Sequence, residues 1–333
     1  MSSARLTRPL SSRAAVLLLV LFSLSLLARP AIAEALGGTP LGGIPLGGIP
    51  LGGTPLGGTP LGGTPPRLVT IDWTIAETLL GLGVTPLGVA QTDAYRDWVG
   101  APELPGPVAD LGLRAQPNLE LLADLAPERI LISPMFASLE SRLSRIAPVS
   151  TVSLYNREGP LWPNLLAATR EIAELAGRPR AAERLIDDTQ THIDALADTL
   201  PPIERPLLMV QFMDERHVRI FGEHSLYQAV LERLGLDNAW TGTTNSWGFS
   251  LVGLEALAGI DARLVVVEPL PVGVEAALAD NGLWRHLEPV RNDRVVTLPP
   301  VWSFGGLLSA QRFAEQLADA LRAAEQGEED DTP

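Results

Sequence analysis

The chain has 333 residues, a hydrophobic content of 46% and a formal net charge of −14, so it is long enough for two lobes with hydrophobic cores. The negative charge disfavours nucleic-acid binding, which needs cationic side chains against the phosphates. All 25 basic residues are arginine and there is no cysteine, which excludes lysine Schiff bases, thiol catalysis, disulfides and thiolate metal sites.

Residues 1–33 have the pattern of a cleavable secretory signal peptide. A basic stretch precedes the apolar run "AAVLLLVLFSLSLLA", and "AIA" at Ala31–Ala33 is a small-x-small cleavage site. We predict cleavage after Ala33, with an uncleaved membrane anchor as the alternative. Because no cysteine follows for lipid attachment, we expect a mature protein that is exported to the periplasm without a lipid anchor.

Residues 34–66 are predicted to form a flexible linker. They contain six copies of the unit L-G-G-[TI]-P, from Leu36 to Pro65. Proline and two glycines in each unit oppose both helix and paired strand. At the other end of the chain, residues 325–333 read as a solvated acidic tail.

Strand and helix patterns alternate from Arg67 onward. The strands are the short apolar runs "RLVTI", "PLGVA" and "RILIS", and the helices are "IAETLLGLG" and "LELLADL". Such alternation predicts a parallel sheet with helices on its faces, in an N-terminal α/β lobe over residues 67–156.

A helical segment follows. Apolar residues recur three, four or seven positions apart between Asn164 and Leu200, and Pro179 after Gly177 is expected to kink or split the helix. We predict that residues 157–202 form a connecting helical strut that limits how far two lobes can close.

The second half repeats the pattern of the first. The stretch at Gly253–Pro269, "GLEALAGIDARLVVVEP", aligns with "NLELLADLAPERILISP" at Asn118–Pro134, and both read as a helix leading into a buried strand. The predicted fold class is therefore α/β, with two Rossmann-like lobes joined by a long helix and the C-terminal lobe at residues 203–324.

Aromatic residues and one arginine follow the predicted strands. In parallel α/β sheets the ligand site lies beyond the carboxyl ends of the strands. These positions hold Trp73, Trp98, Arg114, Phe136, Trp247 and Trp302. We expect them to line one cleft between the lobes, while Trp240, in the same loop as Trp247, is expected to pack in the core.

Catalytic patterns are weak. The four histidines are scattered without metal-ligand spacing, and no G-x-S-x-G elbow or strand-bound G-x-G-x-x-G is present. An exported α/β hydrolase built on His224-Ser225 is the rival from another class, although Ser225 is better placed to cap the following helix. The chain is predicted not to be an enzyme and to need no cofactor or metal of its own.

Several stretches together resemble the family of periplasmic binding proteins for iron(III)-hydroxamate (ferrichrome-type) siderophores, which feed an ATP-binding-cassette (ABC) importer. They are "TIDWTIAETLLGLGVTPLGVAQTDAYRDWV", "DLGLRAQPNLELLADLAPERIL", "FGEHSL", "NAWTGTTNSWG" and "VWSFGGLLSA". The resemblance runs from Arg67 to about Leu321 and implies the class III periplasmic-binding-protein fold, two lobes joined by one long helix.

The resemblance also implies roles for single residues. The family's ligand-binding arginine falls on Arg114, and its cleft tryptophans fall on Trp73, Trp98, Trp247 and Trp302. Its cleft tyrosine falls on Phe136, which lacks the hydroxyl donor, and a further cleft tryptophan falls near Ile132. Two acidic residues that dock such binders onto the permease fall on Glu140 and Glu275.

Siderophore chemistry agrees with these residue types. A ferric tris-hydroxamate is already fully coordinated, so the protein needs no metal ligands, while arginine can bond its outward oxygens and tryptophan can cover its apolar skeleton. Expected partners are the ferric siderophore and an inner-membrane ABC permease with its ATPase, and we expect a monomer. A binder of a catecholate siderophore, haem or cobalamin stays open as the alternative within binding.

Overall fold

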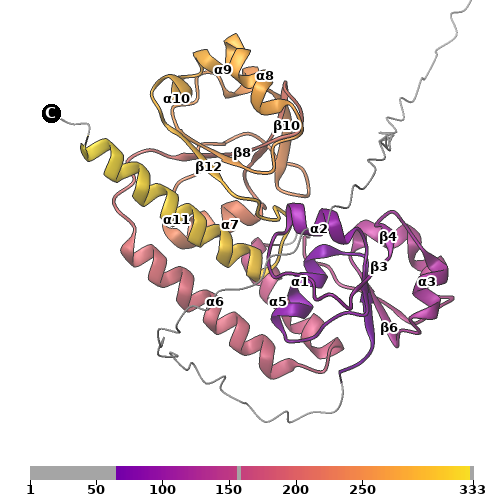
Figure 1. Ribbon diagram of the computed structural model, residues 1–333. Coiled ribbons are helices and arrows are strands. Elements are labelled where there is room, and N and C mark those ends of the chain that lie inside the picture. Colours follow the sequence, from indigo (N-terminus) through magenta and orange to yellow (C-terminus); the bar gives the residue numbers. More distant parts are fainter. Residues whose placement is uncertain (1–64, 156–158, 331–333) are drawn as a thin grey trace, which may run out of the picture. The chain divides into compact units, whose positions relative to one another are not determined.

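The computed structural model describes residues 65–155 and 159–330, with side chains up to residue 326. These residues fall within one compact unit, 59–333, in which two sheets with flanking helices form two lobes (Figure 1). The predicted signal peptide and nearly all of the predicted linker lie outside the described residues.

The first sheet is parallel throughout, as the alternating pattern predicts. Its strand order is β3-β2-β1-β6-β7. The elements of this lobe are β1 (Leu68–Thr70), α1 (Trp73–Gly81), β2 (Gly88–Val89), α2 (Thr92–Trp98), β3 (Ala109–Asp110), the hairpin β4 (Gly112–Leu113) and β5 (Gln116–Pro117), α3 (Leu119–Asp124), β6 (Arg129–Ile132), the 3-10 helix η1 (Pro134–Leu139), α4 (Glu140–Leu143) and β7 (Val149–Thr151).

The second sheet is mixed, with order β10-β9-β8-β11-β12. Strands β8, β11 and β12 are parallel, whereas β9 runs antiparallel to both of its neighbours. The elements of this lobe are β8 (Leu207–Phe212), β9 (His217–Phe221), α7 (Leu226–Leu234), β10 (Phe249–Gly253), the 3-10 helix η2 (Leu254–Leu257), β11 (Arg263–Val267), α8 (Val274–Asp280), α9 (Gly282–His286), α10 (Glu288–Arg291), β12 (Val295–Leu298) and α11 (Leu307–Asp330).

The internal repeat is confirmed at the level of structure. Strands β6 and β11, which end the two similar stretches, each occupy the fourth position of their sheet. The helical part differs, because α3 precedes β6 whereas only the 3-10 helix η2 precedes β11.

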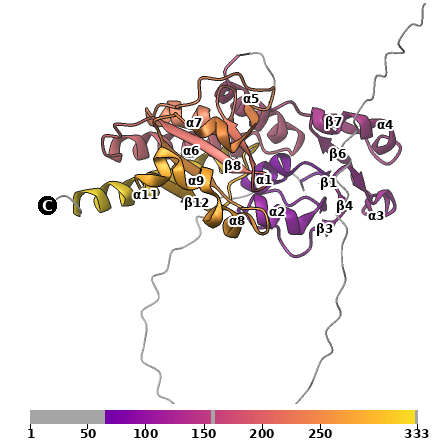
Figure 2. The same cartoon turned by 90° about the horizontal axis from the view of Figure 1, so that it is seen from above.

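The connecting helical segment is split, as Pro179 predicts. It forms α5 (Leu161–Leu175) and α6 (Pro179–Thr199), and Gly177 between them has φ 64°, a backbone conformation that favours glycine. Arg170 and Glu183 bridge the two helices through paired hydrogen bonds of 2.8 and 2.9 Å. Helix α5 packs against α1, while α6 packs against α7 and α11 (Figures 1 and 2).

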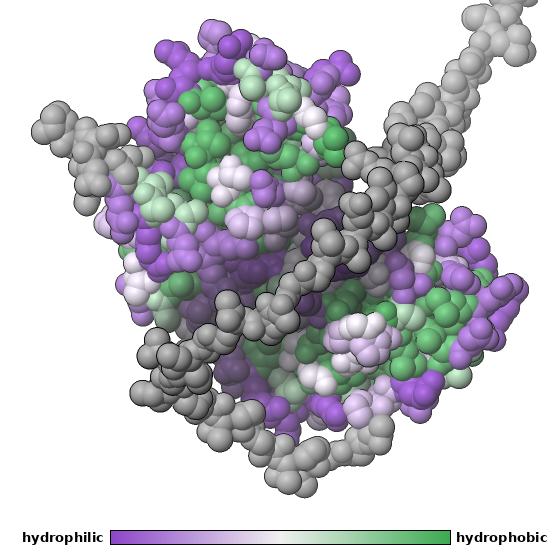
Figure 3. Space-filling view, viewed as in Figure 1, coloured by the Kyte–Doolittle hydropathy of each residue, from purple (hydrophilic) through white to green (hydrophobic). Residues whose placement is uncertain are grey.

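One hydrophobic core continues through both lobes. Alternate residues of a strand face opposite sides of a sheet, so Leu68 of β1 joins this shared core while Val69 faces the outer side of its own lobe. The shared core takes in residues of α1, α5, α6, α7 and α11. The surface in Figure 3 mixes hydrophobic and hydrophilic residues on both lobes, and no helix in the described ranges is long and apolar enough to cross a membrane.

Two segments differ from the sequence-based expectation. Helix α11 continues to Asp330, into the predicted tail, and its Glu325 pairs with the buried Arg263 at 2.8 Å. The stretch containing Trp240 and Trp247 precedes strand β10 and does not follow a strand. Strand β9 is antiparallel to β10, so Phe221 at the end of β9 lies beside Phe249 at the start of β10. This pairing still brings the stretch to the edge of the lobe.

Candidate functional site

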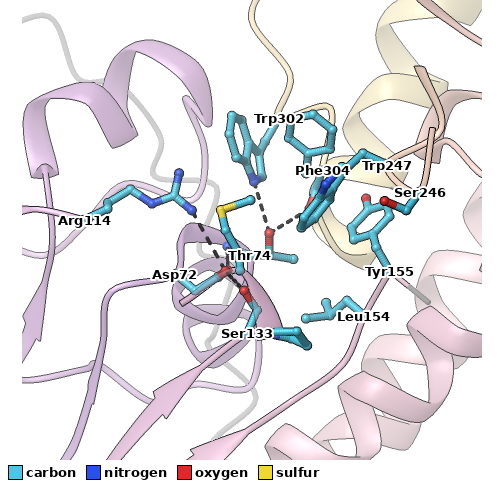
Figure 4. A pocket seen from close by; sticks show the side chains of 12 residues that line it. Asp72, Thr74, Arg114, Ser133, Leu154, Tyr155, Ser246, Trp247, Trp302 and Phe304 are labelled. Atoms are coloured by element: carbon cyan, nitrogen blue, oxygen red, sulfur yellow. Dashed lines mark hydrogen bonds and ion pairs between the residues drawn. The ribbon is translucent and has the colours of Figure 1, made fainter. Parts of the chain in front are cut away.

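A cavity of about 250 Å³ lies between the end of the first sheet and loops of the second lobe (Figure 4). The first lobe contributes the residues that follow β1, β6 and β7 together with the turn of the β4–β5 hairpin. The second contributes the segments before β10 and after β12. The lining residues are Asp72, Thr74, Arg114, Ser133, Pro134, Met135, Leu154, Tyr155, Ser246, Trp247, Trp302 and Phe304.

Asp72 anchors the floor of the cavity. It is the N-cap of α1, where its Oδ1 accepts hydrogen bonds from the backbone N–H of Thr74 at 2.9 Å and of Ile75 at 3.3 Å. Its Oδ2 accepts from the Ser133 hydroxyl at 2.6 Å. The carboxylate is therefore held by the helix terminus and by the residue after β6, with little freedom to turn away.

Arg114 approaches the cavity from the hairpin turn. Its Nε donates to the backbone oxygen of Ile71 at 3.2 Å, and its Nη2 lies 3.9 Å from Oδ2 of Asp72. The guanidinium carbon lies 4.3 Å from the ring centroid of Trp73 and 5.0 Å from that of Phe136. Burial lowers the pKa of Arg114 and nearby Asp72 opposes that shift, but a guanidinium stays protonated at neutral pH.

The terminal nitrogens of Arg114 are free to donate hydrogen bonds into the cavity. Neither Nη1 nor Nη2 forms a hydrogen bond with another described residue. The carboxylate of Asp72 is 3.9 Å from Nη2, which is too far for a hydrogen bond. The side chain is only 13% exposed. A fixed planar group with two unused NH₂ groups is well suited to bond oxygen atoms of a ligand.

A chain of hydrogen bonds holds the loop after β12 against α1. The indole Nε1 of Trp302 donates to the hydroxyl of Thr74 at 3.0 Å, and that hydroxyl donates to the backbone oxygen of Phe304 at 2.7 Å. The Trp302 ring lies 5.2 Å from that of Phe304, edge to face. These contacts fix two aromatic side chains in the wall of the cavity.

Tyr155 and Trp247 complete the wall opposite Arg114 (Figure 4). Their ring centroids are 5.9 Å apart, and Trp247 lies 5.6 Å from Phe304. The Tyr155 hydroxyl donates to the backbone oxygen of Gly305 at 2.9 Å. Burial raises its pKa well above the usual value, so this hydroxyl stays neutral. The cavity thus has a polar, charged side and an aromatic side.

The structure brings three of the six predicted ligand residues into the cavity lining, namely Arg114, Trp247 and Trp302. Trp73 and Phe136 are instead buried beneath Arg114, and the indole Nε1 of Trp73 donates to the backbone oxygen of Ala90 at 2.8 Å. Trp98, the last residue of α2, packs partly buried against the cluster that contains Trp73. Direct ligand contact stays a prediction for all six residues. Trp73 and Phe136 lie against the Arg114 guanidinium and support it.

Sequence reasoning missed Asp72, Tyr155 and Phe304 as lining residues. Asp72 and Phe304 could have been found, because each is adjacent, or nearly so, to a tryptophan at the end of a strand. Tyr155 carries no such signal, because it follows the short strand β7 by four residues. Ile132, where the resemblance expects a tryptophan, is fully buried in the first lobe.

Trp240 packs in the core, as expected. It lies partly buried against the hydrophobic cluster that contains Leu208 and Val210 of β8. A Cβ atom on Gly222 or Gly242 would come within 2.7 Å of its ring, so both glycines are needed for this close packing.

Glu77 joins the two lobes behind the cavity. It is fully buried on α1, where it accepts hydrogen bonds from the backbone N–H of Gly306 and, at 2.6 Å, from the hydroxyl of Ser309. Gly306 immediately precedes α11, and Ser309 lies in its first turn, shortly after Phe304. Burial raises the pKa of Glu77 to about 7, and the two hydrogen bonds only partly oppose this shift.

The described residues contain no cluster of three or more His, Asp or Glu side chains that could hold a metal ion. Ser225 caps α7 as predicted: its hydroxyl accepts from the backbone N–H of Gln228 at 3.0 Å and donates to the backbone oxygen of Gly222 at 2.7 Å. A buried hydroxyl committed to these bonds is poorly placed for nucleophilic attack.

Glu140 and Glu275 occupy corresponding places in the two lobes. Glu140 begins α4 beyond β6, and Glu275 lies in the first turn of α8 beyond β11. Both side chains are exposed, and an acidic side chain is favourable near a helix N-terminus.

Comparison with known proteins places the fold. Residues 68–301 match the family described as "Periplasmic binding protein". The chain is 35% identical over 264 residues to the iron(3+)-hydroxamate-binding protein FhuD of Escherichia coli, with 77% of this chain and 86% of that protein covered. It is 27% identical over 255 residues to the Fe(3+) dicitrate-binding periplasmic protein FecB of the same organism, with 74% and 82% covered.

A solved structure agrees with these matches. The Fe3+–Desferal-bound siderophore-binding protein FhuD of Vibrio cholerae superimposes with a TM-score of 0.71 at 29% identity, with 77% of this chain and 97% of that chain covered. The predicted fold class, two α/β lobes with a long connecting helical segment, is confirmed by this similarity.

Proposed function

Because the chain belongs to the periplasmic binding protein family, we propose that it binds an iron(III)-hydroxamate siderophore in the cavity beside Arg114 and delivers the complex to an ABC permease. The family consists of binding proteins, so the chain is not an enzyme, as the sequence predicts. The Escherichia coli relative is named for iron(3+)-hydroxamate binding, and the Vibrio cholerae structure is of a siderophore-binding protein with Fe3+–Desferal bound.

The observation that carries this proposal is the pairing of Arg114 with an aromatic wall across one cavity. The free NH₂ groups of Arg114 would donate to the hydroxamate oxygens on the surface of the complex. Trp247, Trp302 and Phe304 would cover its apolar skeleton, since rigid rings bury area at a small entropy cost. At about 250 Å³ the cavity is small for such a ligand, so part of the complex would extend out of it.

Iron itself would stay inside the siderophore. The ligand oxygens complete its coordination, so the protein contributes hydrogen bonds and packing and no metal bond. The scattered histidines and the lack of an acidic cluster among the described side chains agree with this mode of binding.

A fluorescence titration tests the proposal. Ferrichrome, ferrioxamine B and a ferric citrate-based hydroxamate are added separately to the purified protein while tryptophan emission is followed. At least one should quench the emission with saturation at micromolar concentration or below, because Trp247 and Trp302 line the proposed site. A ferric catecholate, haem and cobalamin serve as comparison ligands, and tighter binding of one of these than of every hydroxamate would contradict the proposal.

We also propose that Glu140 and Glu275 dock the loaded protein onto basic residues of the permease. Both are exposed and lie beyond the strands that lead to the cavity side of each lobe. The double substitution Glu140→Arg and Glu275→Arg should abolish siderophore-dependent growth, because like charges would then meet at the interface.

The control for this double variant is its dissociation constant for the siderophore, which should stay unchanged because neither residue lines the cavity. A second control, Glu120→Arg, reverses the charge of an exposed residue of α3. Normal growth of the double variant would remove both residues from the proposed docking surface.

For localisation, we propose that the segment 1–33 directs export and is removed, so that the mature protein is periplasmic without a lipid anchor. The apolar run, the small-x-small site and the lack of cysteine support this proposal.

A further inference from the structure

We propose that Asp72 offsets the positive charge of Arg114 at the cavity, so that the protein does not favour anionic ferric chelates over neutral or cationic ones of similar shape. This inference rests on the proposed function and adds the charge class of the ligand to it. The feature that carries it is a buried carboxylate placed beside the ligand-binding arginine.

Asp72 and Arg114 are the two charged side chains among the described residues that line the cavity. Their nearest atoms, Oδ2 and Nη2, are 3.9 Å apart, and the side chains are only 6% and 13% exposed. One negative and one positive charge lie together, so the formal charge of this lining is zero. An anionic chelate would meet the arginine but also the carboxylate next to it.

The negative charge is built into the local structure. Oδ1 of Asp72 caps α1 and Oδ2 accepts from Ser133, so three donors converge on one carboxylate. The N-terminus of α1 adds a favourable partial positive charge. The carboxylate thus keeps its place whether or not a ligand is present, and its electric field acts on any ligand in the cavity.

Other charged groups lie behind the lining. Arg219 lies over the rings of Phe249 and Phe304, with its guanidinium carbon 4.9 and 5.7 Å from the centroids. Glu77 lies on α1, bonded to the start of α11. Neither lines the cavity, and burial raises the pKa of Glu77 to about 7, so its carboxyl is only partly ionised at neutral pH. Asp72 and Arg114 are therefore the formal charges nearest to a ligand in the cavity.

The expected effect follows from Coulomb's law. A charge on the ligand about 6 Å from Asp72, at an effective dielectric constant of about 20, changes affinity by roughly tenfold to hundredfold. A pendant ammonium group gains from Asp72, a pendant carboxylate loses, and a neutral chelate is little affected. The ratio of affinities for chelates of equal shape but different charge therefore measures the effect of the Asp72 carboxylate directly.

The test measures two ratios of dissociation constants in the whole protein: that of a cationic chelate to a neutral one, and that of an anionic chelate to the same neutral one. Ferrichrome is the neutral probe, ferrioxamine B carries one ammonium group, and a ferric citrate-based hydroxamate carries free carboxylate. Asp72→Asn keeps the cap, because the asparagine oxygen can still accept from the N–H groups of Thr74 and Ile75. Glu120→Gln, on the exposed face of α3, is the matched control for the loss of one negative charge.

In Asp72→Asn the ammonium probe should lose at least about tenfold in affinity relative to ferrichrome, and the anionic probe should gain about as much. Glu120→Gln should leave both ratios within about twofold of the wild type. Arg114→Met supplies an independent check that needs no change at the cap: the ammonium probe should then gain relative to ferrichrome, since Asp72 is left unbalanced.

Unchanged ratios in Asp72→Asn, or a shift in Arg114→Met that favours the anionic probe, would overturn the inference. An equal shift of these ratios in Glu120→Gln would also overturn it, because the change in affinity would then come from the net charge of the protein and not from the carboxylate at the cavity. If the wild type binds none of the three probes, the proposed function fails, and this outcome is distinct from binding with unchanged ratios.

Discussion

Replacing Arg114 with alanine is expected to weaken siderophore binding by about 1.5–3 kcal/mol, the scale of hydrogen bonds to a charged group. The variant removes the two free NH₂ groups of Arg114 and leaves Asp72 without its ion-pair partner. Calorimetric titration with ferrichrome at constant pH and salt concentration measures the change. An unchanged dissociation constant would leave Arg114 only a structural role, stacked on Trp73 and Phe136.

Arg96→Ala is the matched control for this experiment. Arg96 lies on α2, its side chain is 57% exposed, and it pairs with Asp93 on the same helix. It does not line the cavity. We expect this variant to bind ferrichrome as the wild type does. Thermal unfolding of both variants separates a loss of ligand contacts from a loss of folded protein.

Stability should depend on pH through Glu77. Burial raises the pKa of its carboxyl from 4.5 to about 7, so the folded state holds this proton more tightly than the unfolded state. The resulting stabilisation is fully present below about pH 4.5 and is lost as the pH rises through about 7. The loss amounts to about 3 kcal/mol at most.

The substitution Glu77→Gln should remove this dependence. The amide is neutral at every pH, its oxygen can accept from the N–H of Gly306, and its NH₂ group can donate to the Ser309 hydroxyl. The free energy of unfolding of the variant, relative to the wild type, should therefore rise by about 3 kcal/mol between pH 4.5 and 7.5.

Urea unfolding at a series of pH values measures this difference, with Glu120→Gln as a control for an exposed carboxyl group. A difference between Glu77→Gln and the wild type that stays constant across the series would show that Glu77 does not titrate in this range. The result also bears on the site, because Glu77 holds the start of α11 and hence the loop that carries Trp302 and Phe304.

Much of the fold was predictable from local patterns. Short apolar runs rich in β-branched residues became β1 and β6, and the apolar period of the middle segment became α5 and α6 with a break before Pro179. Such features are set by residues that are close together in the sequence, so they can be recognised from one sequence alone. The internal repeat further indicated two related lobes, which the matching positions of β6 and β11 confirm.

The antiparallel strand β9 was not predictable in the same way. Its direction is set by pairing with β8 across a turn and with β10 after a separation of many residues. For this reason the Trp247 segment was assigned to the end of a strand, although it precedes one. It reached the cavity nonetheless because paired antiparallel strands bring these two positions to one edge.

The candidate site was only partly predictable for a related reason. Tryptophan and phenylalanine at strand ends can line a cavity or support what lines it, and the outcome depends on contacts far away in sequence. Trp73 and Phe136 became the surfaces beneath Arg114, which comes from a hairpin about 40 and 20 residues away, respectively. The pairing of Asp72 with Arg114 is of the same kind, since neither residue alone indicates the other.

The central claim is that a ferric chelate sits between Arg114 and the aromatic wall and is recognised from outside its coordination shell. Anomalous diffraction at the iron edge, from crystals grown with ferrichrome, tests it most directly. The account predicts one iron peak at the cavity, siderophore oxygens within hydrogen-bond distance of the Arg114 NH₂ groups, and no protein atom bonded to iron. An iron peak away from this cavity, or iron bonded to a protein side chain, would contradict it.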